Sequence, residues 1–276
     1  MPSEHDFHKL AVGFFLPQED SRRHVYNVDL NRRTAWENLF AINLLCRAGD
    51  FSQLYIVKYI LRGSEDSLIW DAGVNILACA GGWDMVASSL DHFRDLQDKE
   101  WVRYHLSSLI GLSCDIRAVG PLVRLYFLGT NPYEDRDQTL RELSYLLEPD
   151  DGAIFYSRHD DPSPESVAAM VEPTRLAVAD AIVGTKVLDA QTFDVFQLAR
   201  RLLAKLRAED AQSERFHRGL LLFEAATGVY CTGFFDEKNR LHLLSAVAAI
   251  EDFLDREDTS RFAPGTRYFF GHPIQE

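Results

Sequence analysis

A helical unit that recurs about every 33 residues is the feature that most constrains the fold of this chain. Three segments, AWENLFAINLLCRAGDF, IWDAGVNILACAGGWDM and EWVRYHLSSLIGLSCDI, carry the same landmarks in the same order. The shared landmarks are a tryptophan near the start, a cysteine near the end of the first helix and an aspartate opening the next (Trp36, Trp70 and Trp101; Cys46, Cys79 and Cys114; Asp50, Asp84 and Asp115). A period of this length with two helices per unit favours a stacked helical-repeat array over an ordinary helical bundle.

The remaining chain also predicts helices, so we expect an all-α fold. Thr34 and Glu37 have the spacing of a capping box ahead of the first helix. Apolar residues at helical spacing predict long amphipathic helices around residues 195–206, 220–227 and 243–254, the second of them closed by Gly228. The aromatic tail RFAPGTRYFFGHPIQE is expected to fold back as a cap, because the outer face of a terminal repeat has no neighbour.

Proline and its neighbours predict the helix boundaries in the middle of the chain. Asn131 before a proline opens a helix, and Ser163 before a proline opens the next. Pro173 is expected to kink or split that second helix. We expect one helical-repeat domain over residues 1–276, with halves at about 31–148 and 163–257 joined by an acidic loop at 148–165.

The acidic loop EPDDGAIFYSRHDDPSPE is the most unusual segment of the sequence. It is open to three interpretations: a solvated connector, a docking surface for a cationic partner, or a site for Mg²⁺ or Ca²⁺. Its apolar AIFY run should anchor it to the helices and turn the acids outward. We predict partner binding by acids of this loop and of the preceding helix start (Asp150, Asp151, Asp160, Asp161, Glu134 and Asp135).

Charge and cysteine usage narrow the classes of function. A net charge of −13 repels phosphate backbones, which argues against a nucleic-acid partner and favours a basic protein. The four cysteines lie too far apart for a Cys-x-x-Cys motif, so buried thiols in a reducing compartment are expected. The apolar run at residues 10–16 is too short to span a bilayer and follows acidic residues. We therefore expect a cytoplasmic protein without an export signal or membrane anchor.

Signatures of catalysis are missing from the sequence. It has no phosphate-binding glycine loop, no nucleophile elbow and no His-Glu-x-x-His motif, and its nine histidines are scattered. The acidic loop has neither the odd-position pattern of a calcium loop nor a basic clamp for diphosphate. We accordingly predict no catalytic residues, no metal ligands and no cofactor.

The segments DSLIWDAGVNILACAGG, LLLFEAATG and YFFGHPI together resemble HEAT-like all-helical immunity proteins of bacterial polymorphic toxin systems. The resemblance implies a HEAT-like stack of helical hairpins, an α-solenoid, that binds one cognate toxin domain in the cytoplasm and occludes it without catalysis. A helical-repeat adaptor in an unrelated complex, and a metal-dependent hydrolase or transferase that uses the aspartate-rich loop, are the alternatives. The sequence leaves the oligomeric state open.

Overall fold

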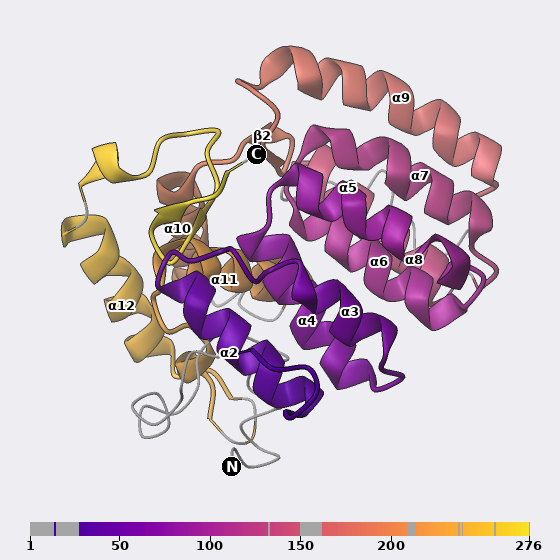
Figure 1. The fold of residues 1–276 in the computed structure, drawn as a ribbon. Helices are drawn as coiled ribbons and strands as arrows, with labels where there is room; N and C mark the ends of the chain where they lie inside the picture. Colours follow the sequence, from indigo (N-terminus) through magenta and orange to yellow (C-terminus); the bar gives the residue numbers. More distant parts are fainter. Residues whose placement is uncertain are drawn as a thin grey trace. The chain divides into compact units, whose positions relative to one another are not determined.

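The computed structural model describes Phe14 and residues 28–131, 133–149, 162–208, 213–236, 238, 240–256 and 258–275. These residues are predominantly helical, which confirms the all-α class (Figure 1). The chain forms two compact units: one combines residues 1–81 with 194–275, and the other spans residues 82–193. The predicted halves do not coincide with these units, because the second unit includes residues on both sides of the acidic loop.

The first unit is built from the two ends of the chain. Its helices are α2 (Ala35–Arg47), α3 (Ile56–Arg62), α4 (Ser67–Ala80), α10 (Val195–Arg207), α11 (Glu214–Thr227) and α12 (Leu243–Arg256), with short 3₁₀ turns at Thr232–Phe234 and Thr259–Arg261. Strands β3 (Tyr268–Phe269) and β4 (His272–Pro273) form an antiparallel hairpin, with Tyr268 opposite Pro273 and Phe269 opposite His272.

The second unit holds the middle of the chain. Its helices are α5 (Trp83–His92), α6 (Glu100–Leu112), α7 (Val119–Leu128), α8 (Asp135–Leu147) and α9 (Pro164–Ala181), with 3₁₀ turns at Arg94–Leu96 and Ile116–Ala118. Strands β1 (Val187–Leu188) and β2 (Gln191–Thr192) pair antiparallel, with Val187 opposite Thr192 and Leu188 opposite Gln191.

Several predicted helix ends are confirmed. The capping box of α2 is complete: the Thr34 hydroxyl accepts from the Glu37 amide at 3.3 Å, and the Glu37 carboxylate accepts from the Thr34 amide at 2.8 Å. Gly228 ends α11 in the left-handed region, with φ 76°. A Cβ there would lie 3.0 Å from the Phe270 ring, so both the backbone and the packing favour glycine.

Other boundaries differ from the predictions. Asp50 caps only a turn, since its carboxylate accepts from the Ser52 amide and α3 begins later, at Ile56. Helix α8 begins at Asp135 rather than directly after Asn131. Pro173 does not split α9, which runs unbroken from Pro164 to Ala181.

The repeat landmarks are buried to different extents. All four cysteines are buried, and Trp70 has no exposed surface. Its indole N–H donates to the Ser64 carbonyl at 3.0 Å. Trp36 and Trp101 are only half-buried. The shared period therefore does not place the three tryptophans in equivalent environments.

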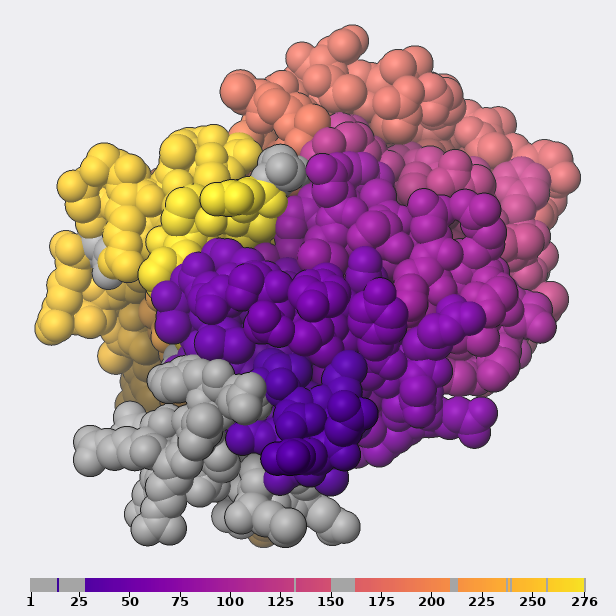
Figure 2. Space-filling view, in the orientation of Figure 1, coloured from indigo at the N-terminus to yellow at the C-terminus, as the bar shows by residue number. Residues whose placement is uncertain are grey.

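The C-terminal tail packs back onto the first unit as a hairpin and not as irregular chain. The amides of Phe270 and Gly271 donate to the carbonyls of Ala225 and Ala226 in α11, at 2.7 and 2.8 Å. Arg267 donates to the Ala78 carbonyl of α4, at 2.7 Å. In the space-filling view the yellow C-terminal residues border the indigo and violet N-terminal residues (Figure 2).

Candidate functional site

The structure describes two of the six predicted partner-binding acids. Asp150, Asp151, Asp160 and Asp161 lie outside the described residues, so the interpretations of the acidic loop stay predictions. Glu134 is exposed. Asp135 is 1% exposed and belongs to the interior. Its predicted place in a docking surface is therefore corrected, because an enclosed carboxylate has no access to a partner.

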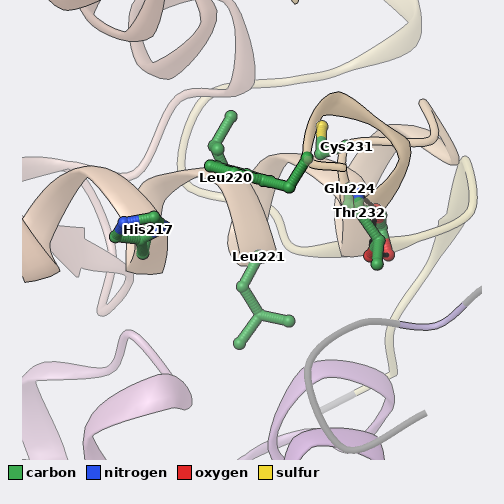
Figure 3. Close-up of a pocket in the computed structure, with 7 residues that line it drawn as sticks. His217, Leu220, Leu221, Glu224, Cys231 and Thr232 are labelled. Carbon is green, nitrogen blue, oxygen red and sulfur yellow. Dashed lines mark hydrogen bonds between the residues drawn. The ribbon is translucent and has the colours of Figure 1, made fainter. Parts of the chain in front are cut away.

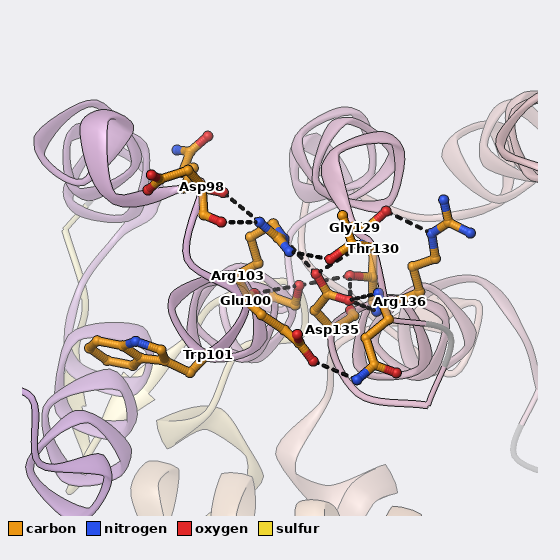
Figure 4. A network of polar contacts seen from close by, with 12 residues as sticks. Asp98, Glu100, Trp101, Arg103, Gly129, Thr130, Asp135 and Arg136 are labelled. Atoms are coloured by element: carbon orange, nitrogen blue, oxygen red, sulfur yellow. Dashed lines mark hydrogen bonds and ion pairs between the residues drawn. The ribbon is translucent and has the colours of Figure 1, made fainter.

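Asp135 instead forms a buried ion pair with Arg103 of α6 (Figure 4). The Arg103 Nε atom lies 2.5 Å from Asp135 Oδ2, and the two side chains are 4% and 1% exposed. Arg103 also donates through Nη1 to the carbonyls of Gln97 and Asp98, each at 2.9 Å. The guanidinium thus ties the start of α6 to the start of α8, while its charge is balanced.

The same pair fixes the loop between α7 and α8. Arg103 Nη2 donates to the Thr130 hydroxyl at 3.1 Å. The Asp135 carboxylate accepts from the Asn131 amide at 3.1 Å and from the Thr130 amide at 3.4 Å. Arg136 adds a bond from Nε to the Gly129 carbonyl at 2.9 Å. Side chains of α6 and α8 therefore hold the backbone of this loop in place.

Asn131 of this loop contacts Glu100, the first residue of α6. Asn131 Nδ2 donates to Glu100 Oε1 at 2.7 Å, and Asn131 Oδ1 accepts from the Tyr133 amide at 3.0 Å. Glu134 follows directly and lies beside Glu100. The Glu100 carboxyl raises the pKa of Glu134, first through a hydrogen bond between the two groups and then through its negative charge. The two carboxyl groups therefore lie near each other, with Glu134 exposed and Glu100 half-buried.

Large exposed apolar side chains lie close in sequence to Glu134. Phe127 and Leu128 end α7 and are 47% and 49% exposed, and Tyr133 is 87% exposed. Monomeric proteins carry scattered exposed apolar residues, and here three occur within seven positions of the sequence, 127–133. We call Glu100, Phe127, Leu128, Tyr133 and Glu134 the acidic corner.

A separate pocket lies in the first unit, along α11 and the segment that follows it. It has a volume of about 370 Å³. Figure 3 shows His217 at one end, Glu224 with Thr232 and Cys231 at the other, and Leu220 and Leu221 between them. Phe235 completes the wall, and its ring lies 5.3 Å from that of His217. The pocket is therefore mainly apolar with one polar end.

Glu224 is the buried acid of this pocket. Its carboxylate accepts from the Phe14 amide at 2.8 Å, from the Thr232 amide at 2.7 Å and from the Thr232 hydroxyl. Burial raises the pKa of Glu224, although these hydrogen bonds oppose the effect. Burial and the nearby Glu224 charge also raise the pKa of the Cys231 thiol, so Cys231 stays protonated and is unsuited to nucleophilic chemistry.

The described part of the chain shows neither a metal cluster nor a membrane-spanning helix. Its histidines, cysteines, aspartates and glutamates form no group of three or more that could hold a metal ion. Within the same ranges, no helix combines the length and apolar composition needed to cross a membrane.

Comparison of the chain with models of protein families, with curated proteins and with solved structures finds no match. The function therefore has to be argued from the acidic corner and the pocket themselves. Sequence reasoning missed Glu100, Tyr133 and Arg103. Arg103 carried a signal, because it shares the spacing of Leu106 and Ile110 and so falls on the apolar face of its helix.

Proposed function

We propose that this protein is a cytoplasmic immunity protein with a HEAT-like helical-repeat fold, which binds a basic toxin domain and occludes it. One observation carries the proposal. The exposed Tyr133 and Glu134 follow a loop that a buried ion pair fixes, and Glu100 at the start of α6 adds a second acid near Glu134, whose pKa it raises. Occlusion is steric and electrostatic, and no bond is made or broken.

The acidic corner suits a cationic group of a protein partner. Two adjacent carboxylates repel each other, as the raised pKa of Glu134 indicates, and an arginine or lysine placed between them would relieve the repulsion. Tyrosine is among the residues that most often dominate binding energy, and its ring can also face a cation. The net charge of −13 would speed the approach of a basic partner.

The fixed loop supports the same function. Ordering a mobile loop on binding costs free energy, which lowers affinity. Here the backbone of residues 129–131 is already held by Arg103, Asp135 and Arg136 before any partner arrives. The corner would therefore present its side chains with little further loss of conformational entropy.

Protection of cells is the direct test. The chain should restore growth when it is co-expressed with the toxin domain encoded beside its own gene. A neighbouring gene for a secreted protein with a variable C-terminal toxin domain is required, and a metabolic operon in its place would contradict the proposal. An adaptor would bind a partner without protecting cells.

Three variants connect protection to the acidic corner. The double change Glu100→Gln with Glu134→Gln, and separately Tyr133→Ala, should weaken binding to the purified toxin domain. Asp84→Asn, an exposed acid in the first turn of α5, is the matched control and should bind as the wild type does. Equal binding by all of these variants would remove the acidic corner from the proposal.

Association and dissociation rates distinguish the contribution of the two charges from that of the contact area of Tyr133. The Glu100 and Glu134 charges should act mainly on the association rate, with an effect that shrinks as salt is raised. Tyr133→Ala should act mainly on dissociation, because it removes buried contact area. Stopped-flow measurements at low and at physiological salt would show both effects.

A further inference from the structure

The pocket of the first unit has the dimensions and walls of a small-molecule site. Its volume of about 370 Å³ lies within the ~300–1,000 Å³ typical of such sites. Leu220, Leu221 and Phe235 supply apolar surface, and Glu224 with Thr232 supplies a single polar end (Figure 3). An occupant would accordingly have an apolar body and one polar group.

The polar end is a buried carboxyl group, and the described residues that donate to it include no cation. The groups that donate to Glu224 are neutral: the amides of Phe14 and Thr232, and the Thr232 hydroxyl. Burial of a charge without an opposite charge costs free energy, and this cost is why burial raises the pKa of Glu224. A cation entering the pocket would recover part of that cost.

The Thr232 hydroxyl is the donor to Glu224 that a ligand could replace. It lies 3.2 Å from Oε1 and 3.1 Å from Oε2 and shares one proton between them. An ammonium group that displaced this hydroxyl would donate to the carboxylate while the amide hydrogen bonds of Phe14 and Thr232 stay in place.

The opposite end of the pocket does not repel a cation. His217 stacks against Phe235, and partial burial lowers its pKa, with the smaller effect of Glu214 acting in the other direction. The imidazole is therefore uncharged at neutral pH. Its ring and that of Phe235 form an aromatic wall on which the apolar part of a ligand can lie.

We propose that this pocket binds a small amphiphilic amine, with the ammonium group directed at Glu224 and the apolar body against Leu220, Leu221 and Phe235. The site belongs to the first unit, whereas the acidic corner belongs to the second. The proposal is therefore independent of toxin binding, and either can fail without the other.

The test is calorimetric titration of the full chain with 2-phenylethylamine and with 2-phenylethanol, which share an apolar body and differ in charge. The measurements are made at neutral pH and about 150 mM salt, where exposed charges are screened over about 8 Å. We expect one-to-one binding of the amine, at least about fivefold tighter than the alcohol, because hydrogen bonds to a charged group are the stronger ones.

Two variants with one control locate the binding. Leu221→Trp should fill the pocket and abolish amine binding, whereas Leu244→Trp, at a position 84% exposed in α12, should leave it unchanged. Glu224→Gln should make the amine and the alcohol bind equally. If Glu224→Gln does not fold, the comparison of the two tryptophan variants still decides the location.

Three results would overturn the proposal. Equal affinity of the wild type for amine and alcohol would mean that Glu224 does not select a cation. Undiminished amine binding by Leu221→Trp would place the amine elsewhere on this acidic chain. Absence of binding at millimolar amine would mean that the pocket is no amine site.

Discussion

Replacement of Asp135 by alanine tests whether the buried ion pair holds the acidic corner in place. The change removes the carboxylate that lies 2.5 Å from Arg103 Nε, at a position where both side chains are almost fully enclosed. It also removes the acceptor of the Asn131 and Thr130 amides. Arg103 is left as a buried cation without its counter-ion.

The expected loss in free energy of unfolding depends on the hydrogen bonds that Arg103 keeps. Breaking a buried ion pair by removing one partner costs about 3–5 kcal/mol, largely because the other charge stays buried. Arg103 keeps its bonds to the carbonyls of Gln97 and Asp98 and to the Thr130 hydroxyl, which partly solvate the guanidinium. Thr130 is exposed and Asn131 is half-buried, so water can reach their amides. We therefore expect a loss of about 3 kcal/mol, near the lower end of that range.

Urea unfolding followed by circular dichroism measures this loss. Asp137→Ala is the control on the same helix, because Asp137 pairs with Arg141 one turn away where both side chains remain partly exposed. Such a pair contributes about 0.3–0.5 kcal/mol. Hydrogen exchange at residues 129–134 should accelerate in Asp135→Ala and stay unchanged in Asp137→Ala.

A double change separates the ion pair from other losses. Arg103→Met with Asp135→Leu should destabilise by less than the sum of the two single changes, since it leaves no unpaired buried charge. A loss below about 1 kcal/mol for Asp135→Ala, or strict additivity in the double variant, would refute the reasoning.

Three further outcomes are expected. Trp70→Ala should cost about 3–5 kcal/mol in urea unfolding, as a fully buried aromatic residue does, and a cost below about 1 kcal/mol would contradict its packing. Glu224→Gln should cost about 1–3 kcal/mol despite its similar shape, because its amide would face the Phe14 and Thr232 donors, and an unchanged unfolding midpoint would argue against that arrangement. Burial alone would raise the pKa of Asp115, but hydrogen bonds from Arg117 and Lys186 lower it below its ordinary value of 3.8. Its contribution is therefore present above pH 3.8 and is lost as the pH falls through the lowered pKa, so Asp115→Asn should flatten the acid limb of stability measured between neutral pH and about pH 2.

The helices were predictable because their signals are local. Thr34 with Glu37, and Gly228, act on the backbone within a few residues, so the sequence pattern and the structure agree. Asp50 failed as a helix cap because a turn intervenes before α3, and a good capping residue serves a turn equally well. Pro173 was expected to kink or split its helix, and the split is wrong: α9 continues through Pro173, which removes only its own amide hydrogen bond.

The acidic corner was only partly predictable, for a different reason. Glu134 and Asp135 are neighbours at the start of α8 and look alike in the sequence, as acids that complement a helix N-terminus. Asp135 is buried and Glu134 is exposed because Arg103, 32 residues away from Asp135, pairs with the carboxylate of Asp135 and not with that of Glu134. No local sequence pattern predicts such a contact. The only indication was the position of Arg103 on the apolar face of α6, which implies a buried acid as its partner.

Because Glu134 is exposed and Asp135 is buried, their replacement should change the binding kinetics of the proposed complex in different ways. Glu134 would meet the partner, so its loss should slow association at low salt and leave the folded state unchanged. Asp135 meets no partner, so its loss should act through the loop: the loop becomes mobile, and ordering it again costs affinity on binding. That cost should persist at high salt, where the effect of Glu134 has faded. Salt dependence that was the same for Glu134→Gln and Asp135→Ala would mean that the ion pair does not preorganise the loop, and Asp135 would then have no effect on binding beyond its charge.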